Sequence, residues 1–226
     1  MNSIVENLKE IASSLPEGVK LVAVSKTKPV EAIVEAYEAG QRVFGENRVQ
    51  ELAEKYEVLP KDIEWHMIGH LQTNKVKYMA AFVSLIHGVE SLKLLETIDK
   101  EGKKHDRVIP CLLQFYIASE ETKFGLDMEE AKALLESAYY KNMKNVKIVG
   151  VMGMATNTDD EVQVRREFHH LKEIFDELKA TYFAENPEFK ELSMGMSGDY
   201  RIAVEEGSTM VRVGSSIFGA RNYAHI

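Results

Sequence analysis

The chain has 226 residues, of which 28 are Lys or Arg and 36 are Asp or Glu, so its formal net charge is −8. Nucleic-acid-binding domains usually carry a basic surface that neutralises phosphates, and this acidic composition argues against nucleic acid as the main ligand. The hydrophobic fraction of 45% and the charged fraction of 28% are typical of a folded domain and exclude a disordered chain.

The cysteine content and the N-terminus bear on the cellular compartment. Cys111 is the single cysteine and lies in an apolar run, so no internal disulfide is possible and we interpret it as a core residue. The first 18 residues carry apolar side chains at helical spacing and lack the pattern of a signal peptide. No apolar run approaches the roughly 20 residues that span a bilayer. We therefore expect a cytoplasmic protein with no membrane segment.

Helix and strand patterns alternate along the chain. Apolar residues at spacings of three and four predict a helix over 4–15, which ends before Pro16 and Gly18. The apolar run 21–24 predicts a buried strand, and a helix is expected to begin at Pro29. The same pattern then repeats, with strands expected at 42–45, 64–69, 82–87, 107–117, 146–152, 191–196 and 210–213, and helices expected at 49–59, after 74, at 91–104, from about 128, at about 160–183 and at 199–207.

Eight strands that alternate with helices indicate right-handed βαβ units, and eight is the strand count of a closed (β/α)8 TIM barrel. An open doubly wound sheet is the alternative, but the G-x-G-x-x-G turn that usually follows its first strand is absent. No linker rich in Pro, Gly or Ser divides the sequence. We therefore predict an α/β protein in which residues 1–226 form a single TIM-barrel domain with an extra N-terminal helix.

The functional residues of a TIM barrel follow the carboxyl ends of its strands. Lys26 comes directly after the strand at 21–24, where desolvation would lower its pKa and allow it to form a Schiff base with a carbonyl compound. Lys28 precedes Pro29, which favours an extended backbone and would place both lysines on the same side. Lys26 is the candidate nucleophile; the alternative is an ordinary solvated loop lysine.

Two turns of small residues follow the last two strands, at 194–199 (Met-Gly-Met-Ser-Gly-Asp) and at 213–216 (Val-Gly-Ser-Ser). Backbone N–H groups and hydroxyls in such turns can bind phosphate, and TIM barrels often bind phosphate beside strands seven and eight. Because Ser and Gly are also common turn residues, ordinary turns remain the alternative. Together with a Schiff-base lysine, the two turns indicate a phosphorylated aldehyde or ketone as ligand. The histidines show no metal-binding spacing, so no metal is expected.

Several motifs resemble the YggS/PROSC family of pyridoxal 5′-phosphate (PLP)-binding proteins over essentially the whole chain, namely AVSKTKPVEAI, FGENRVQE, WHMIGHLQTNK and SMGMSGDYRIAVEEGSTMVRVGSSIFGAR. The resemblance implies a single barrel like the N-terminal domain of alanine racemase. It also implies PLP as cofactor, held as an internal aldimine by Lys26. The remaining contacts that it implies are Ser197, Gly214 and Ser215 at the phosphate, Arg212 at the pyridine nitrogen and Asn47 at the border of the ring.

Arg212 bears on whether bound PLP would be catalytic. An arginine keeps its proton, so it would leave the pyridine nitrogen unprotonated and make PLP a poor electron sink. The resemblance extends to alanine racemases, which use a similar arginine but add a C-terminal domain that supplies a tyrosine base across a dimer. We expect no such domain here, and therefore a monomer that binds PLP without significant turnover.

The expected function is a PLP carrier in intracellular PLP (vitamin B6) homeostasis, with an indirect effect on amino-acid and keto-acid balance. PLP-dependent apoenzymes are possible recipients of the cofactor. One alternative is a low-activity PLP-dependent amino-acid racemase, and another is a cofactor-free Schiff-base aldolase. Lys123 is a second lysine that could meet PLP, although a position on a flexible loop is favoured.

Overall fold

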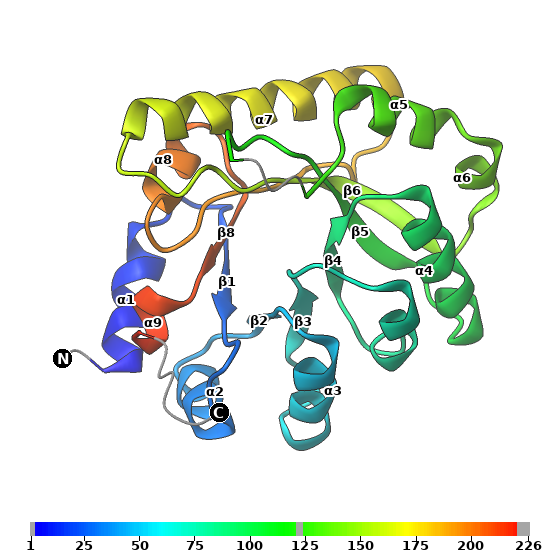
Figure 1. The fold of residues 1–226 in the computed structure, drawn as a ribbon. Coiled ribbons are helices and arrows are strands. Elements are labelled where there is room, and N and C mark those ends of the chain that lie inside the picture. The colour runs from blue at the N-terminus through cyan, green and yellow to red at the C-terminus, as the bar shows by residue number, and fades with distance from the viewer. Residues whose placement is uncertain (1–2, 121–123, 221–226) are drawn as a thin grey trace.

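Eight parallel strands close into a barrel, and each strand is hydrogen-bonded to the next in chain order (Figure 1). The computed structural model describes residues 3–120 and 124–220, so Lys123 lies outside the described residues. The barrel closes where β1 (Lys20–Val24) pairs with β8 (Met210–Val213), with Val22 beside Arg212. The predicted TIM barrel is therefore confirmed.

The remaining strands are β2 (Val43–Glu46), β3 (Glu64–Met67), β4 (Leu85–Val89), β5 (Ile109–Gln114), β6 (Val146–Met152) and β7 (Glu191–Ser193). The helices that surround them are α1 (Ile4–Ser14), α2 (Val30–Glu38), α3 (Val49–Val58), α4 (Leu92–Lys104), α5 (Met128–Glu136), α6 (Ala138–Asn142), α7 (Glu161–Tyr182), α8 (Tyr200–Glu205) and α9 (Ser215–Phe218), with a 3₁₀ helix, η1, at Thr73–Tyr78. The bounds of β6 and β8 are those that the sequence pattern predicts.

The region between β3 and β4 differs most from the prediction. The strand expected at 82–87 begins later, as β4 at Leu85–Val89. The amides of Phe82 and Val83 donate to the Met79 carbonyl and form a turn before it. The helix expected after residue 74 is the 3₁₀ helix η1. The short helices α6 and α9 were not predicted, since segments of four or five residues carry almost no periodic signal.

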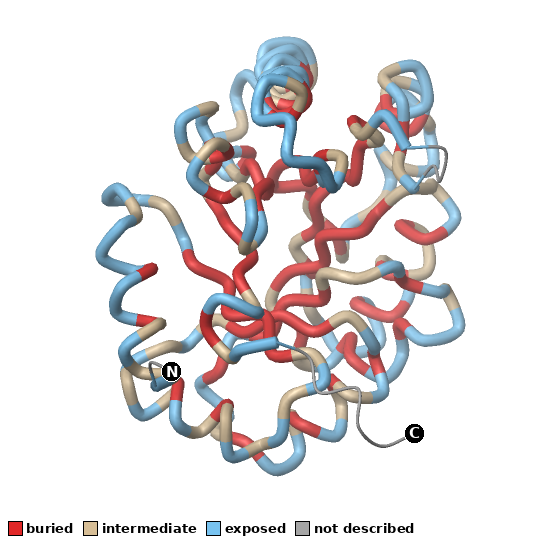
Figure 2. Tube along the Cα trace, turned by 60° about the vertical axis from the view of Figure 1, so that its left-hand side comes forward, coloured by how far each residue is buried: buried red, intermediate tan, exposed pale blue. Residues whose placement is uncertain are grey.

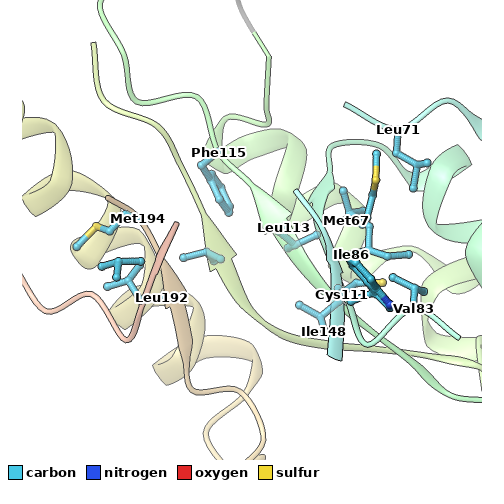
Figure 3. Close-up of a cluster of buried hydrophobic side chains, with 14 of the residues drawn as sticks. Met67, Leu71, Val83, Ile86, Cys111, Leu113, Phe115, Ile148, Leu192 and Met194 are labelled. Carbon is cyan, nitrogen blue, oxygen red and sulfur yellow. The ribbon is translucent and has the colours of Figure 1, made fainter. Parts of the chain in front are cut away.

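Side chains along the strands alternate between two cores, as the pleat of a strand requires. One small apolar cluster lies inside the barrel and consists of Val22, Leu85, Leu112, Val149, Met152 and Met210. The larger cluster lies between strands and helices, and Figure 3 shows Cys111 within it near Ile86 and Ile148. Cys111 is fully buried, as predicted for a core residue. Buried positions follow the central strands, while exposed positions gather on the outer helices (Figure 2).

The N-terminal helix α1 begins with a capping box, in which Ser3 and Glu6 exchange side-chain to backbone hydrogen bonds. Leu8 and Ile11 form its buried face, and the Asn7 side chain donates to the Ile217 carbonyl in α9 over 3.0 Å. Helix α1 thus supports α9, beside which it lies in Figure 1. None of the helices in the described ranges has the length and apolar character needed to cross a bilayer.

Candidate functional site

A cavity of about 730 Å³ opens at the carboxyl ends of the strands. Every residue that the sequence indicated for cofactor binding lines it, namely Lys26, Asn47, Ser197, Arg212, Gly214 and Ser215. These residues follow or belong to β1, β2, β7 and β8, which are neighbours in the closed barrel. Closure of the barrel therefore brings the two halves of the predicted site together.

Lys26 lies in a tight turn that directly follows β1. The Lys28 amide donates to the Ser25 carbonyl over 3.1 Å, which closes the turn, and the half-buried Lys26 side chain lines the cavity. Thr27 has φ of 64°, in the left-handed region that a β-branched residue rarely adopts. The expectation of an extended chain from Lys26 to Lys28 is therefore wrong, because the turn reverses the backbone within these residues.

Lys28 also lines the cavity, but its amine has defined partners. Its Nζ donates to the carbonyl oxygens of Phe218, Gly219 and Ala220 over 3.2, 3.1 and 3.0 Å. These bonds fix the segment that follows α9 against the turn after β1. Lys28 therefore helps to close the wall of the cavity on the side of β8.

The two small-residue turns meet at one point. The Ser197 hydroxyl accepts hydrogen bonds from the amides of Gly214, over 3.2 Å, and Ser216, over 3.4 Å. Gly195 lets the first of these turns pack against α8, since its φ is +101° and a Cβ there would lie 2.7 Å from Cβ of Ala203. A hydroxyl and backbone N–H groups thus converge where an anion such as phosphate can be bound.

Arg212 supplies a fixed positive charge that borders the cavity. Its Nη1 donates to Oγ of Ser193 over 2.6 Å, and Nη2 donates to the carbonyl of Gly153 over 3.3 Å. Burial lowers the pKa of Arg212 to about 10, and the Asp199 carboxylate opposes this effect. The guanidinium therefore stays charged at neutral pH, with 3% of the residue exposed.

A chain of buried polar side chains continues from Arg212 through the barrel. Oγ of Ser193 lies 2.9 Å from Nδ1 of His87, and Nε2 of His87 lies 2.9 Å from Nδ1 of His66. Burial, reinforced by nearby positive charges, lowers the pKa of His66 to about 3 and that of His87 well below its usual value. Both rings are therefore neutral at pH 7.

The hydroxyl of Ser193 links Arg212 to the two histidines. It accepts from Nη1 of Arg212, and because both rings are neutral, the Ser193–His87 and His87–His66 contacts each have one donor and one acceptor. His66, His87 and Ser193 were not predicted as site residues. Their signal was a histidine or serine within an otherwise apolar strand, at positions that the strand period directs into the barrel.

A second buried polar group lies behind the Lys26 turn. Glu46, at the end of β2, accepts from the Ser25 hydroxyl over 2.7 Å and from Nζ of Lys55 over 2.6 Å. Burial raises the pKa of Glu46 to about 7, although the Lys55 ammonium partly offsets this rise. Lys55 was not predicted, because only its place on the apolar face of α3, with Val49 and Leu52, marks it in the sequence. Among the described residues, no group of three His, Cys, Asp or Glu side chains could hold a metal ion.

Comparison with known proteins places the chain in a family. The family described as "Alanine racemase, N-terminal domain" matches residues 1–222. The pyridoxal phosphate homeostasis protein of Aquifex aeolicus is 41% identical over 227 residues, which cover 99% of this chain and 97% of that protein.

Solved structures agree with this placement. PipY of Synechococcus elongatus without PLP is 38% identical, covers 96% of this chain and 100% of its own, and has a TM-score of 0.87. The form with PLP bound has 37% identity, the same coverage and a TM-score of 0.84. The alanine racemase of Bartonella henselae shares only the fold, at 18% identity and a TM-score of 0.72, with 98% of this chain and 63% of that chain covered. The chain therefore belongs to the alanine racemase N-terminal domain family and, within it, to the pyridoxal phosphate homeostasis proteins.

Proposed function

We propose that this protein binds PLP in the cavity at the carboxyl ends of its strands and serves PLP homeostasis. One observation carries the proposal: a single cavity combines the Lys26 amine, the convergent donors at Ser197 and Gly214, and the buried Arg212 cation. Its relatives are named pyridoxal phosphate homeostasis proteins, and the PLP-bound PipY structure supports the same cofactor. Membership in this family argues against the cofactor-free aldolase.

The residues present fit PLP in both charge and chemistry. In the proposed arrangement, Lys26 binds the aldehyde carbon, and Asn47 borders the ring. The phosphate is bound by the Ser197 hydroxyl and by the backbone at Gly214 and Ser215, where the amide of Gly214 already points to the Ser197 oxygen. When bound, PLP supplies an electron-withdrawing ring that can activate the Cα–H bond of an amine.

Arg212 determines how strongly that chemistry can be used. In the proposed site it donates an N–H to the ring nitrogen, and because a guanidinium keeps its proton, that nitrogen stays unprotonated. The Ser193 and Gly153 contacts keep the charge in place. We therefore propose a PLP carrier with little turnover. A low-activity amino-acid racemase is the second candidate, favoured by the fold that the chain shares with alanine racemases.

The two candidates differ in exchange at Cα of amino acids. The PLP-loaded protein would be incubated at high concentration with single L-amino acids in D₂O, and deuterium at Cα would be followed by NMR. The carrier predicts stable PLP binding and exchange no faster than with free PLP. Rapid exchange that disappears in Lys26→Ala would contradict the carrier and establish the racemase.

We also propose that residues 1–226 act as one PLP-binding unit and as a monomer. In support, a single closed barrel carries every proposed contact. Light scattering coupled to size-exclusion chromatography tests the oligomeric state, and a dimer mass would contradict the monomer.

We further propose PLP-dependent apoenzymes as recipients of the cofactor. Transfer of PLP from the loaded protein to an added apoenzyme would test this.

A further inference from the structure

A cluster of buried charges occupies the space between α3, the end of β2 and the turn after β1. Nζ of Lys55 is its centre and donates to Oε1 of Glu46 over 2.6 Å, to Oε1 of Glu51 over 2.7 Å and to the Ser25 carbonyl over 2.8 Å. The Lys55 residue is 6% exposed, and Glu46 is fully buried. The ammonium thus uses its three donors on three separate segments of the chain.

The cluster holds the Lys26 turn on both sides. The Ser25 carbonyl, which precedes Lys26, accepts from Lys55 and also from the amide that closes the turn. Oε1 of Glu51 accepts from Lys55 and from the Thr27 amide, which follows Lys26, over 2.6 Å. One amine is therefore connected to the residue before Lys26 directly and to the residue after it through a single carboxylate.

The Thr27 backbone shows why such support is needed. Its φ of 64° is unfavourable for a threonine, and a conformation of this kind persists only when surrounding contacts impose it. Hydrogen bonds that involve ionised groups are stronger than neutral ones, and those to Thr27 and Ser25 are of this type. Removal of these bonds would let the turn relax toward an extended backbone, which changes where Lys26 points.

The cluster is also costly, which argues against a role in packing alone. A buried ion pair is often no more stabilising than apolar residues of the same volume. Oε2 of Glu46 has no hydrogen-bond partner within the described structure, so even this acid is incompletely satisfied. An apolar side chain of similar length on α3 would fill the same space, but it could not donate to the Ser25 carbonyl and Glu51 together.

We propose that Lys55 is a positioning residue for PLP binding: through Ser25 and Glu51 it holds the strained turn in the conformation that presents the Lys26 amine to the cofactor. The inference rests on the proposed function, since it takes Lys26 as the site of PLP attachment. Lys55 itself touches no cofactor, because it lies behind the turn and is not among the residues that line the cavity.

Glu51→Ala is the primary test, because the side chain is 24% exposed and its removal leaves Lys55 with two of its partners. Glu54→Ala is the matched control, since this exposed glutamate lies on the same helix and accepts one hydrogen bond from Gln50. Glu51→Gln restores an acceptor for the Thr27 amide and should recover part of the wild-type behaviour. Lys55→Met removes the central charge from a side chain of similar length.

Two readouts separate positioning from stability. Without PLP, we expect hydrogen exchange of the Thr27 amide to accelerate about tenfold or more in Glu51→Ala, because a charge-assisted hydrogen bond is lost. With PLP, we expect the apparent Kd, from titration of the visible band, to rise about tenfold. Glu54→Ala should change neither quantity, and Lys55→Met should exceed Glu51→Ala in both.

The possible results distinguish this inference from the proposed function. Unchanged PLP affinity and unchanged Thr27 exchange in Glu51→Ala would overturn the positioning role, while the wild-type protein would still bind PLP. Faster Thr27 exchange with unchanged PLP affinity would also overturn it, because the turn would then be irrelevant to the cofactor. Failure of the wild-type protein to bind PLP would instead contradict the proposed function. If Lys55→Met does not fold, the Glu51 variants alone decide the matter.

Discussion

The two sides of the cavity are constructed from different physical elements. On the β1 side, a lysine is presented by a strained turn, and long charged side chains from α3 hold that turn. On the side of β7 and β8, backbone amides and one serine hydroxyl converge between glycine-containing turns. The first side depends on ionised side chains, whereas the second depends on backbone geometry.

This difference matches what each side is proposed to bind. A phosphate keeps its charge and shape, so fixed N–H donors suffice for it. The proposed partner of Lys26 is the aldehyde carbon of PLP, and the Lys26 amine lies at the end of a flexible side chain. Contacts from α3 hold the backbone on both sides of Lys26 and so limit where the amine can lie. Arg212 lies between the two sides and is held by neutral partners, the Ser193 hydroxyl and the Gly153 carbonyl.

Arg212→Glu should have the largest effect, because it reverses the charge of the residue that lies between the two sides of the cavity. The substitution places a buried anion against the carbonyl oxygens of Ser193 and Gly153, so we expect PLP affinity to fall by about a hundredfold and the free energy of unfolding by about 3 kcal/mol or more. PLP titration and urea unfolding measure the two quantities. Arg201→Glu, at an exposed arginine, is the control. An unchanged PLP spectrum and affinity would mean that Arg212 does not face the ring.

Glu46→Gln tests whether burial on the charged side of the cavity raises the pKa of Glu46, through the pH dependence of the free energy of unfolding. Because folding raises the pKa of Glu46 from 4.5 to about 7, the folded state holds this proton more tightly, and stability should fall as the pH rises from 4.5 to 7. The full penalty is about 3 kcal/mol, and it is present above pH 7. Gln stays neutral, so urea unfolding at pH 4.5 and pH 8 should show a smaller loss in the variant. Equal losses in both proteins would show that Glu46 titrates normally.

Ser197→Ala probes the backbone side and should have the smallest effect. The variant loses one hydroxyl that meets the amides of Gly214 and Ser216, while those amides remain to bind phosphate. We expect PLP affinity to fall about fivefold, as for one hydrogen bond, and the free energy of unfolding to change by less than about 1 kcal/mol. Ser13→Ala, at an exposed serine on α1, serves as control. A complete loss of binding would show that the hydroxyl, and not the backbone, dominates the anion site.

The sequence predicted the backbone side of the cavity better than the charged side. The turns at Ser197 and Gly214 are local motifs, and the strand order of a closed barrel was enough to bring them together. Lys26 was predicted for the same reason, since it directly follows a strand. The strained Thr27 backbone was not predicted, because the pattern around Pro29 favours extended chain and the contact that overrides it comes from Glu51.

The supporting residues could not be found from local patterns. Lys55 is one lysine among many, and only the packing of α3 against β2 shows that its amine is buried. The chain from Arg212 to His66 joins β7 and β8 to β3 and β4, and its central contact links His87 to Ser193, which are 106 residues apart in sequence. Such networks depend on the angles at which side chains enter the core, which the alternation of apolar and polar residues does not specify.

Attachment of PLP to Lys26 is the central claim, and trapping the cofactor tests it most directly. The protein would be loaded with PLP, reduced with borohydride, digested and mapped by mass spectrometry, with Lys26→Ala treated in parallel. The account predicts a pyridoxyl group on Lys26 in the wild-type protein and no specific adduct in the variant. An adduct on Lys28 or Lys123, or a protein that takes up no PLP, would contradict it.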